Sequence, residues 1–420
     1  MTKYPEFFCL RQKFAAHPLE DVSLAVREAM ARVDLSIQPG QRVAIAVGSR
    51  GIANLTEVVG EVVQRVIAMG GEPLIVPAMG SHGGATSDGQ AQVLASFGIT
   101  AVSMGCPVVS SMDTVLVGTT SGGVDVHFDR TASEADHVIV INRIKPHTRL
   151  TGKYESGLIK MLMIGLGKHS GASLYHQVFP DYEYQLDLLA GEIVQMLIDQ
   201  MPITLGLAIV EDAFEQTSLI EAVAPHELLA REPALLEIAK SRMPRLPFDH
   251  VDLLLVDQIG KEISGTGMDT NVIGRKVNDK AAAANELPKV REIYVRSLTE
   301  KTAGNGTGIG IAEYCHQHVI DAIDMQKVRV NCVTSAHPSA GAIPLTFPSD
   351  RAALDAVVSQ AAVDRIADLR WMWIHNTLEI SELACSRVYL EAAQKNPDFE
   401  ILTDPQPLPF DADGNLQRVR

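Results

Sequence analysis

Apolar runs of strand length alternate with amphipathic helical patterns from about residue 42 onward, and this alternation constrains the fold more than any other feature. Residues 41–49 and 72–80 are typical of buried strands, and residues 55–71 between them are typical of a helix that ends at a glycine pair. The same rhythm predicts a hairpin at 113–129, a strand at 137–144, a helix at 181–200 and a strand at 203–212. Helical crossovers join parallel strands, so the sequence predicts an α/β fold with mostly parallel, helix-covered sheets.

Length and punctuation indicate two domains. A chain of 420 residues exceeds one ordinary hydrophobic core, and two prolines interrupt the periodicity at 241–250. We therefore expect an N-terminal α/β domain over 1–245, joined by the tail 395–420, and a C-terminal α/β domain over 250–390, with the active site in the cleft between them. In the second domain the patterns predict a helix at 311–323, a strand at 328–336 and a helix near 380–395.

Composition excludes several classes of function. The formal net charge of −15 argues against a nucleic-acid partner, although lysines and arginines in a cleft would still attract a small anionic substrate. No stretch approaches the roughly 18 apolar residues of a membrane span, and the first residues lack the apolar stretch of a signal peptide, so we expect a cytoplasmic protein. The five cysteines are scattered without a C-x-x-C pair, which argues against an iron–sulfur cluster or a cysteine-based zinc site.

Three loops of the N-terminal domain follow strand ends and carry a basic residue, which in the first two lies beside glycine. They are Gly48-Ser49-Arg50-Gly51, Gly80-Ser81-His82-Gly83-Gly84 and Lys145-Pro146-His147. Glycine lets the backbone approach a ligand closely, and the helix N-termini that follow offer N–H groups to phosphate or carboxylate. Because parallel strands end at one edge of a sheet, the pattern predicts that these loops share an active-site edge.

The segment 142–176 concentrates chemistry-bearing side chains directly after a predicted strand. It interleaves glycines with three lysines and three histidines: Lys145, His147, Lys160, Lys168, His169 and His176. Such a set suits a site that handles an anion, a metal and a proton together, which favours an enzyme. The chain lacks a P-loop, a nucleophile elbow, a G-x-G-x-x-G fingerprint after the first strand and an H-E-x-x-H motif.

The ordered set Arg50, His82, Lys145-Pro146-His147, Ser156-Gly157-x-x-Lys160 and His176 resembles the lactate racemase (LarA) family, the nickel-pincer-nucleotide-dependent 2-hydroxyacid racemases and epimerases. The resemblance covers most of the chain and is most specific between His147 and His176. It implies a pyridinium-3,5-bisthiocarboxylic acid mononucleotide whose two sulfurs and one ring carbon hold nickel. It also implies a small hydroxyacid substrate, cofactor-biosynthesis proteins as partners, and a possible homo-oligomer.

The resemblance assigns roles residue by residue. Lys160 corresponds to the lysine that tethers the nucleotide, and His176 to the protein ligand of nickel. His82 and His147 correspond to the paired proton-transfer histidines, and Arg50 and Lys261 to the groups that hold the substrate carboxylate. Further cofactor contacts are expected from Ser49, Gly80, Ser81, Gly83, Lys145, Ser156 and Gly157.

These residue types suit inversion of a 2-hydroxyacid on chemical grounds. Each enantiomer needs a base for its hydroxyl proton, and imidazoles that titrate near neutrality serve both directions. An arginine can hold the carboxylate through two hydrogen bonds while the planar intermediate reorients. Imidazole nitrogen is a good nickel ligand, and the cofactor supplies the soft sulfurs, so no cysteine cluster is needed.

The sequence departs from the usual family pattern in two places. Gly48 and Ser49 stand where many members have an aspartate and a threonine, and the usual Ser-Gly-Gly-Ala-Lys reads Ser-Gly-Leu-Ile-Lys, ending at Lys160. We therefore expect a divergent branch that acts on a hydroxyacid other than lactate.

Several alternatives remain open at the level of sequence. His169 competes with His176 as the metal ligand, and Lys145, Lys153 and Lys168 are either solvated charges or phosphate contacts. The same histidines could also serve a divalent-metal-dependent lyase or aldolase without the nucleotide, or a non-catalytic ligand-binding homologue.

Overall fold

The computed structural model describes residues 3–49, 51–361 and 363–418, and the side chains of residues 176, 180 and 363–365 are not described. The chain divides into two compact units, Ala15–Met243 and Met1–Phe14 with Pro244–Arg420, which we call the N-terminal and C-terminal units. Each unit is a sheet covered by helices, so the predicted α/β class is confirmed. The expected cleft between two domains stays a prediction.

The N-terminal unit is built on a five-stranded sheet in the order β3-β2-β6-β7-β8. Its strands are β2 (Arg42–Val47), β3 (Glu72–Pro77), β6 (His137–Arg143), β7 (Ile203–Glu211) and β8 (Thr217–Val223). Strands β3, β2, β6 and β7 are parallel to one another, and the edge strand β8 is antiparallel to β7. The expected hairpin is a separate antiparallel pair, β4 (Thr114–Thr119) and β5 (Asp125–Asp129).

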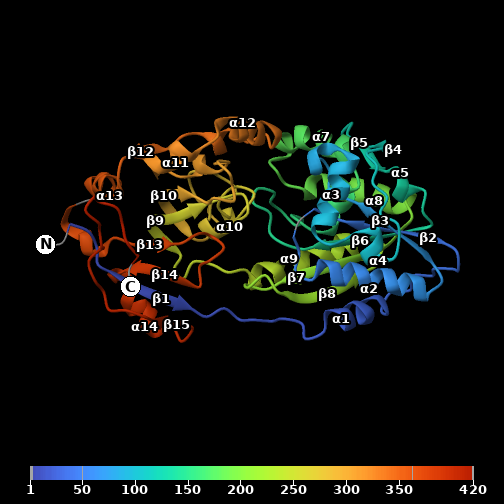
Figure 1. The fold of residues 1–420 in the computed structure, drawn as a ribbon, viewed down its shortest axis with the longest axis horizontal. Coiled ribbons are helices and arrows are strands. Elements are labelled where there is room, and N and C mark those ends of the chain that lie inside the picture. The colour runs from blue at the N-terminus through green and yellow to red at the C-terminus, as the bar shows by residue number, and fades with distance from the viewer. Residues whose placement is uncertain (1–2, 50, 362, 419–420) are drawn as a thin grey trace. The chain divides into compact units, whose positions relative to one another are not determined.

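Helices cover both faces of this sheet (Figure 1). The helices of this unit are α1 (Val22–Met30), α2 (Leu55–Ala68), α3 (Ser87–Ser96), α4 (Ala101–Met104), α5 (Arg130–Ser133), α6 (Leu158–Lys160), α7 (Lys168–Val178), α8 (Asp187–Gln200) and α9 (Leu228–Arg242). In β2, Val43 and Ile45 pack with α1 and α2, whereas Ala44 and Ala46 pack with α8 and α9. Burial of both faces explains why the strand is a continuous apolar run.

The C-terminal unit contains an eight-stranded sheet in the order β12-β11-β10-β9-β13-β14-β1-β15. Its strands are β1 (Phe7–Gln12), β9 (His250–Ile259), β10 (Lys289–Leu298), β11 (Tyr314–His316), β12 (Leu345–Phe347), β13 (Trp371–Ile374), β14 (Glu382–Ser386) and β15 (Phe399–Ile401). Its helices are α10 (Thr270–Ile273), α11 (Gln317–Ala322), α12 (Met325–Thr334), α13 (Asp350–Ser359) and α14 (Leu390–Lys395). From β12 through β13 in this order, each strand is parallel to its neighbour. Strand β14 is antiparallel to β13, and β1 is antiparallel to both β14 and β15.

Both chain ends belong to the C-terminal unit, which corrects the expected domain boundaries. Strand β1 pairs with β14 on one side and β15 on the other, so residues 1–14 do not join the N-terminal domain. The tail 395–420 was expected to join that domain too, but Phe7 N–H donates to the Gln406 carbonyl at 2.8 Å and Arg296 donates to the Leu416 carbonyl at 2.8 Å. Backbone pairing with β1 therefore holds the tail in the C-terminal unit.

Three local predictions in the C-terminal unit are wrong. Residues 328–336, expected as a strand, lie largely in helix α12, because Asp324 caps its first N–H groups and Val328 and Cys332 bury one face. The expected helix at 311–323 begins only at α11, since Tyr314–His316 pairs as strand β11. Part of the helix expected near 380–395 forms strand β14.

Among the described residues, the helices are too short or too polar to cross a bilayer.

Candidate functional site

The three predicted loops leave the same edge of the N-terminal sheet. Strand β2 lies between β3 and β6, parallel to both, and its last residue, Val47, pairs with Pro77 and Ile141. The carboxyl ends of these strands therefore lie side by side, and the predicted shared edge is confirmed. The roles of the individual residues stay predictions.

The first two loops contact each other through side chains. Ser49 Oγ is hydrogen bonded to Nδ1 of His82, whose ring is exposed. Arg50, the next residue, lies outside the described residues. The second loop bends through Gly80 and Gly83 at φ values of +59° and +66°, which favour glycine.

The third loop is closed at its base and holds His147 at its turn. Lys145 and Ser156 exchange backbone hydrogen bonds of 2.8 and 3.2 Å. The ring Nδ1 of His147 accepts hydrogen bonds from the backbone N–H groups of Arg149 and Leu150, both at 3.0 Å. With that nitrogen acting as an acceptor, the neutral ring carries its proton on Nε2.

The segment that carries Lys160 lies against the first two loops. The Asn142 side chain donates to the Gly157 carbonyl at 2.7 Å, which fixes the start of α6, and Lys160 is half-buried at its end. A π-helical turn, Met161–Gly165, follows directly; such turns are rare and frequently occur at functional sites.

Two close approaches join this turn to the loops. Gly80 N–H donates to the Gly165 carbonyl at 3.2 Å, and a Cβ at Gly48 would lie 2.7 Å from Cε of Met161. The predicted cofactor positions Ser49, Gly80, Gly157 and Lys160 therefore come from segments that contact one another.

A buried carboxyl that the sequence analysis missed lies beneath Gly157. Glu232 of α9 is 1% exposed, and its Oε2 accepts the Ile159 N–H at 2.8 Å. Its Oε1 has no hydrogen-bond partner, and a Cβ at Gly157 would lie 2.5 Å from it. Burial raises the pKa of Glu232 to about 7, although the N–H groups of Ile159 and Leu158 oppose the shift.

Sequence did hold a signal for this residue. Glu232 occupies the apolar stripe of α9 together with Leu228, Leu235 and Leu236, all buried. An acid at such a position is unusual, since carboxylates are seldom fully buried without a partner.

Lys168 was expected to be either a solvated charge or a phosphate contact, and the structure agrees with neither. Its side chain is fully buried, so it is not a solvated charge or an accessible phosphate contact. Its Nζ lies 3.0 Å from Asp129 Oδ2, and burial lowers its pKa while Asp129 opposes the shift. Lys153 and His169, by contrast, are exposed.

The two remaining predicted residues are His176 and Lys261. The His176 backbone lies in α7, and its side chain is not described. Lys261 follows β9 in the C-terminal unit, where its Nζ donates to the Gly265 carbonyl at 2.6 Å. Among the described residues, no three His, Cys, Asp or Glu side chains form a group that could hold a metal.

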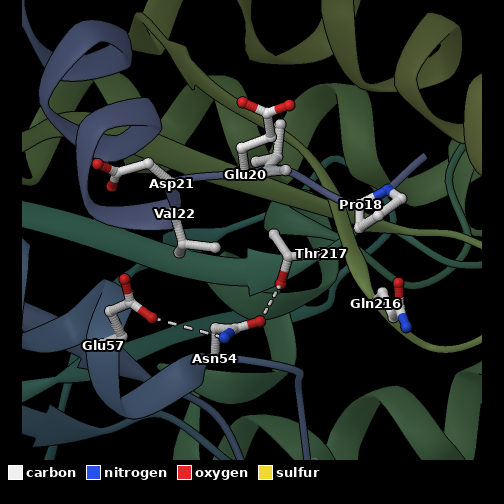
Figure 2. Close-up of a pocket in the computed structure, with 9 residues that line it drawn as sticks. Pro18, Glu20, Asp21, Val22, Asn54, Glu57, Gln216 and Thr217 are labelled. Carbon is white, nitrogen blue, oxygen red and sulfur yellow. Dashed lines mark hydrogen bonds between the residues drawn. The ribbon is translucent and has the colours of Figure 1, made fainter.

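A pocket of about 460 Å³ lies elsewhere in the N-terminal unit, at the starts of α1 and α2 (Figure 2). Glu20, Asp21 and Glu57 line it, and Thr217 donates to the Asn54 side chain at 3.0 Å. None of the residues that line it is a predicted site residue. Its three carboxylates would repel an anionic substrate.

Two solved structures are similar to this chain. A protein from Thermotoga maritima matches with a TM-score of 0.50 and 14% identity, over 79% of this chain and 84% of that chain, a likeness that shows the fold. The lactate racemase apoprotein from Thermoanaerobacterium thermosaccharolyticum matches with a TM-score of 0.46 and 13% identity, over 88% of this chain and 85% of that chain. No curated protein matches the sequence significantly.

A family model gives a more specific result. Residues 10–185 match the lactate racemase N-terminal domain, and this range contains the three loops and the Lys160 segment. Over these residues, the chain is similar to the N-terminal domain of the lactate racemase family.

Proposed function

We propose that this protein racemises or epimerises a 2-hydroxyacid with the aid of a nickel-pincer nucleotide. One observation carries the proposal: within the matched domain, the Ser49 and His82 loops and the segment that bears Lys160 contact one another at a single edge of parallel strands. That edge is where open α/β sheets bind their ligands.

The residues at this edge fit such a nucleotide. A Cβ added at Gly51 or Gly84 would meet no heavy atom within 4 Å, so the backbone at both positions is open to a ligand. The half-buried Lys160 amine is the proposed tether, and His176 is the proposed nickel ligand. Further contacts are proposed from Ser49, Gly80, Ser81, Gly83, Lys145, Ser156 and Gly157. When bound, the group would supply a site that accepts hydride from the substrate and returns it.

Two histidines are proposed to handle the hydroxyl proton. The Ser49 hydroxyl can fix the ring of His82 through Nδ1, which leaves Nε2 to take or give a proton. The Nε2 of His147 carries the proton of the neutral ring, because backbone N–H groups donate to its Nδ1, so in this arrangement Nε2 would donate to the substrate oxygen. His82 would serve as the base for one enantiomer, and His147 would serve as the base for the other once its ring hydrogen bonds have changed so that Nε2 is unprotonated.

Cationic side chains are proposed to bind the substrate carboxylate. Arg50 would do so from the first loop and Lys261 from the C-terminal unit. Lys261 would exchange its present bond to the neutral Gly265 carbonyl for an ion pair with the substrate carboxylate.

Cofactor loading tests the proposal. The protein and its Lys160→Arg variant would be co-expressed with cofactor-making proteins, and intact mass and nickel content measured. We expect added mass and nickel on the natural protein and no covalent mass on the variant, since an arginine cannot form the thioamide. Unmodified, nickel-free natural protein would contradict the proposal, and turnover restored by simple divalent salts without Lys160 would favour the lyase alternative.

A further inference from the structure

Lys168 joins four separate elements through one buried ammonium group. Three oxygen atoms lie within 3.2 Å of its Nζ: the Pro77 carbonyl at 2.5 Å, Asp129 Oδ2 at 3.0 Å and Gln90 Oε1 at 3.2 Å. They come from the end of β3, the end of β5 and helix α3, and Lys168 itself begins α7. The contacts with Pro77 and Gln90 are hydrogen bonds, and the contact with Asp129 is an ion pair.

Gln90 extends the contact to the His82 loop. Its Nε2 donates to the Gly80 carbonyl at 2.8 Å and to the His82 carbonyl at 3.3 Å, and the residue is fully buried. One side of the Gln90 amide is therefore fixed by Lys168, and the other side fixes the backbone on both sides of Ser81. Because a buried amide with fixed partners cannot rotate freely, the loop is held at its start and at His82.

The backbone at Lys168 supports a specific role. Its φ of +52° lies in the left-handed region, which a residue with a side chain rarely adopts. Asp129 is also committed, since its Oδ1 caps α5 by accepting the Ala132 N–H at 2.8 Å. Burying the Lys168–Asp129 pair costs desolvation energy that an apolar contact would not cost. What the pair provides in return is a fixed ammonium group, and that group positions Gln90.

We propose that Lys168 and Gln90 are positioning residues for His82, and that they set the His82 loop against helix α7. The proposal takes its catalytic meaning from the proposed function, in which His82 transfers a proton and α7 bears His176. Its physical content, a loop held by the buried Gln90 amide, can be measured without cofactor or substrate.

Hydrogen exchange followed by mass spectrometry tests this content. Gln90→Leu removes both loop contacts, and Gln90→Glu keeps an oxygen for Lys168 but loses the two N–H donors. We expect peptides covering 79–86 to exchange about tenfold faster in either variant, as for the loss of one or two buried hydrogen bonds, while β6 peptides exchange at the natural rate. Should Gln90→Leu fail to fold, Gln90→Glu supplies the same comparison.

Ser218→Ala is the matched control. Its hydroxyl is also buried, donates to the Val210 carbonyl at 3.0 Å and accepts from Arg242 at 2.7 Å, away from the His82 loop. This variant should leave exchange at 79–86 unchanged. Natural exchange at 79–86 in the Gln90 variants, or equal acceleration in β6, would overturn the proposal.

A turnover measurement separates this proposal from the proposed function. In loaded enzyme, the Gln90 variants should lower kcat more than they raise KM, and His82→Ala should abolish turnover. Unchanged kcat in the Gln90 variants would overturn the positioning role. Full activity of His82→Ala would instead count against the proposed function, while the exchange result would stand.

Discussion

Replacement of Glu232 by glutamine should remove a pH dependence from the stability of the N-terminal unit. The carboxyl is 1% exposed, lies below the backbone that leads to Lys160 and has one oxygen without a hydrogen-bond partner. Burial favours its protonated form and raises its pKa from 4.5 to about 7. Glutamine keeps the shape and an oxygen for the Ile159 N–H but does not titrate.

The sign and size follow from linkage. Between pH 4.5 and about 7 the folded unit holds a proton on Glu232 that the unfolded chain has released. The stabilisation of the folded unit by this proton is therefore fully present below pH 4.5 and is lost as the pH rises through 7. At about 1.4 kcal/mol per pH unit, the difference amounts to about 3 kcal/mol, as an order of magnitude. The natural protein should therefore lose about that much more stability than Glu232→Gln between pH 4.5 and 8.

Tryptophan fluorescence would follow unfolding of the C-terminal unit, because both tryptophans, Trp371 and Trp373, lie there. The stability of the N-terminal unit is therefore measured by hydrogen exchange. Urea titrations would be equilibrated at each pH, labelled in a short deuterium pulse at one fixed pH and read from peptides of β6 and α9.

Glu237→Gln, an exposed acid on the same helix, is the control and should behave like the natural protein. A free-energy difference between the natural protein and Glu232→Gln that stays constant with pH would refute the reasoning.

Three further predictions concern other parts of the chain. Two-bond ¹⁵N–¹H NMR should show Nδ1 of His147 unprotonated and Nε2 protonated in the neutral ring, and the reverse tautomer would contradict the assignment. Gly89→Ala should destabilise the N-terminal unit by about 1–3 kcal/mol in the pulse-labelling assay, because its Cβ would lie 1.8 Å from the Gly83 carbonyl oxygen. Gly60→Ala, whose Cβ would meet nothing within 4 Å, should stabilise it by about 0.4–1 kcal/mol, and equal effects would contradict the packing argument. Asp350→Asn should destabilise the C-terminal unit by about 1.5–3 kcal/mol in urea titrations followed by tryptophan fluorescence, because it removes the buried charge that accepts from Arg296 and leaves Asp257 as the remaining ion-pair partner of that arginine; a loss below about 1 kcal/mol would contradict this.

The sheet edge was predictable from sequence because its information is local. Strands such as β2 and β6 are short apolar runs, and each is followed by glycine or a basic residue. Once the strands are taken as parallel, their ends must share an edge, whatever the details of packing. The pairing of β2 with both β3 and β6 confirms that step.

Helix α12 shows where local patterns mislead. Val328, Val330 and Val333 give the segment a strand-like composition, but Val330 and Val333 are exposed and only one side is buried with Cys332. The Asp324 cap and the spacing of Val328 and Cys332 outweigh β propensity here.

Lys168 and Glu232 show the limit of sequence reasoning at the candidate site. Whether a charged side chain meets water or a buried partner depends on segments far away in the chain, such as Asp129 for Lys168 and Ile159 for Glu232. The contacts that hold the His82 loop, from Lys168 to Gln90 and from Gln90 to Gly80, are likewise tertiary. The spacing of glycine and histidine therefore predicted the loop but not the side chains that support it.

The most direct test of the account follows the hydrogen at C2. Cofactor-loaded protein would be incubated with a panel of 2-hydroxyacids deuterated at C2, and the products analysed by chiral chromatography with mass detection. The account predicts an inverted product that retains deuterium for at least one acid, and no inversion by His82→Ala. Inversion with deuterium lost to water, or no inversion of any acid by nickel-loaded protein, would contradict it.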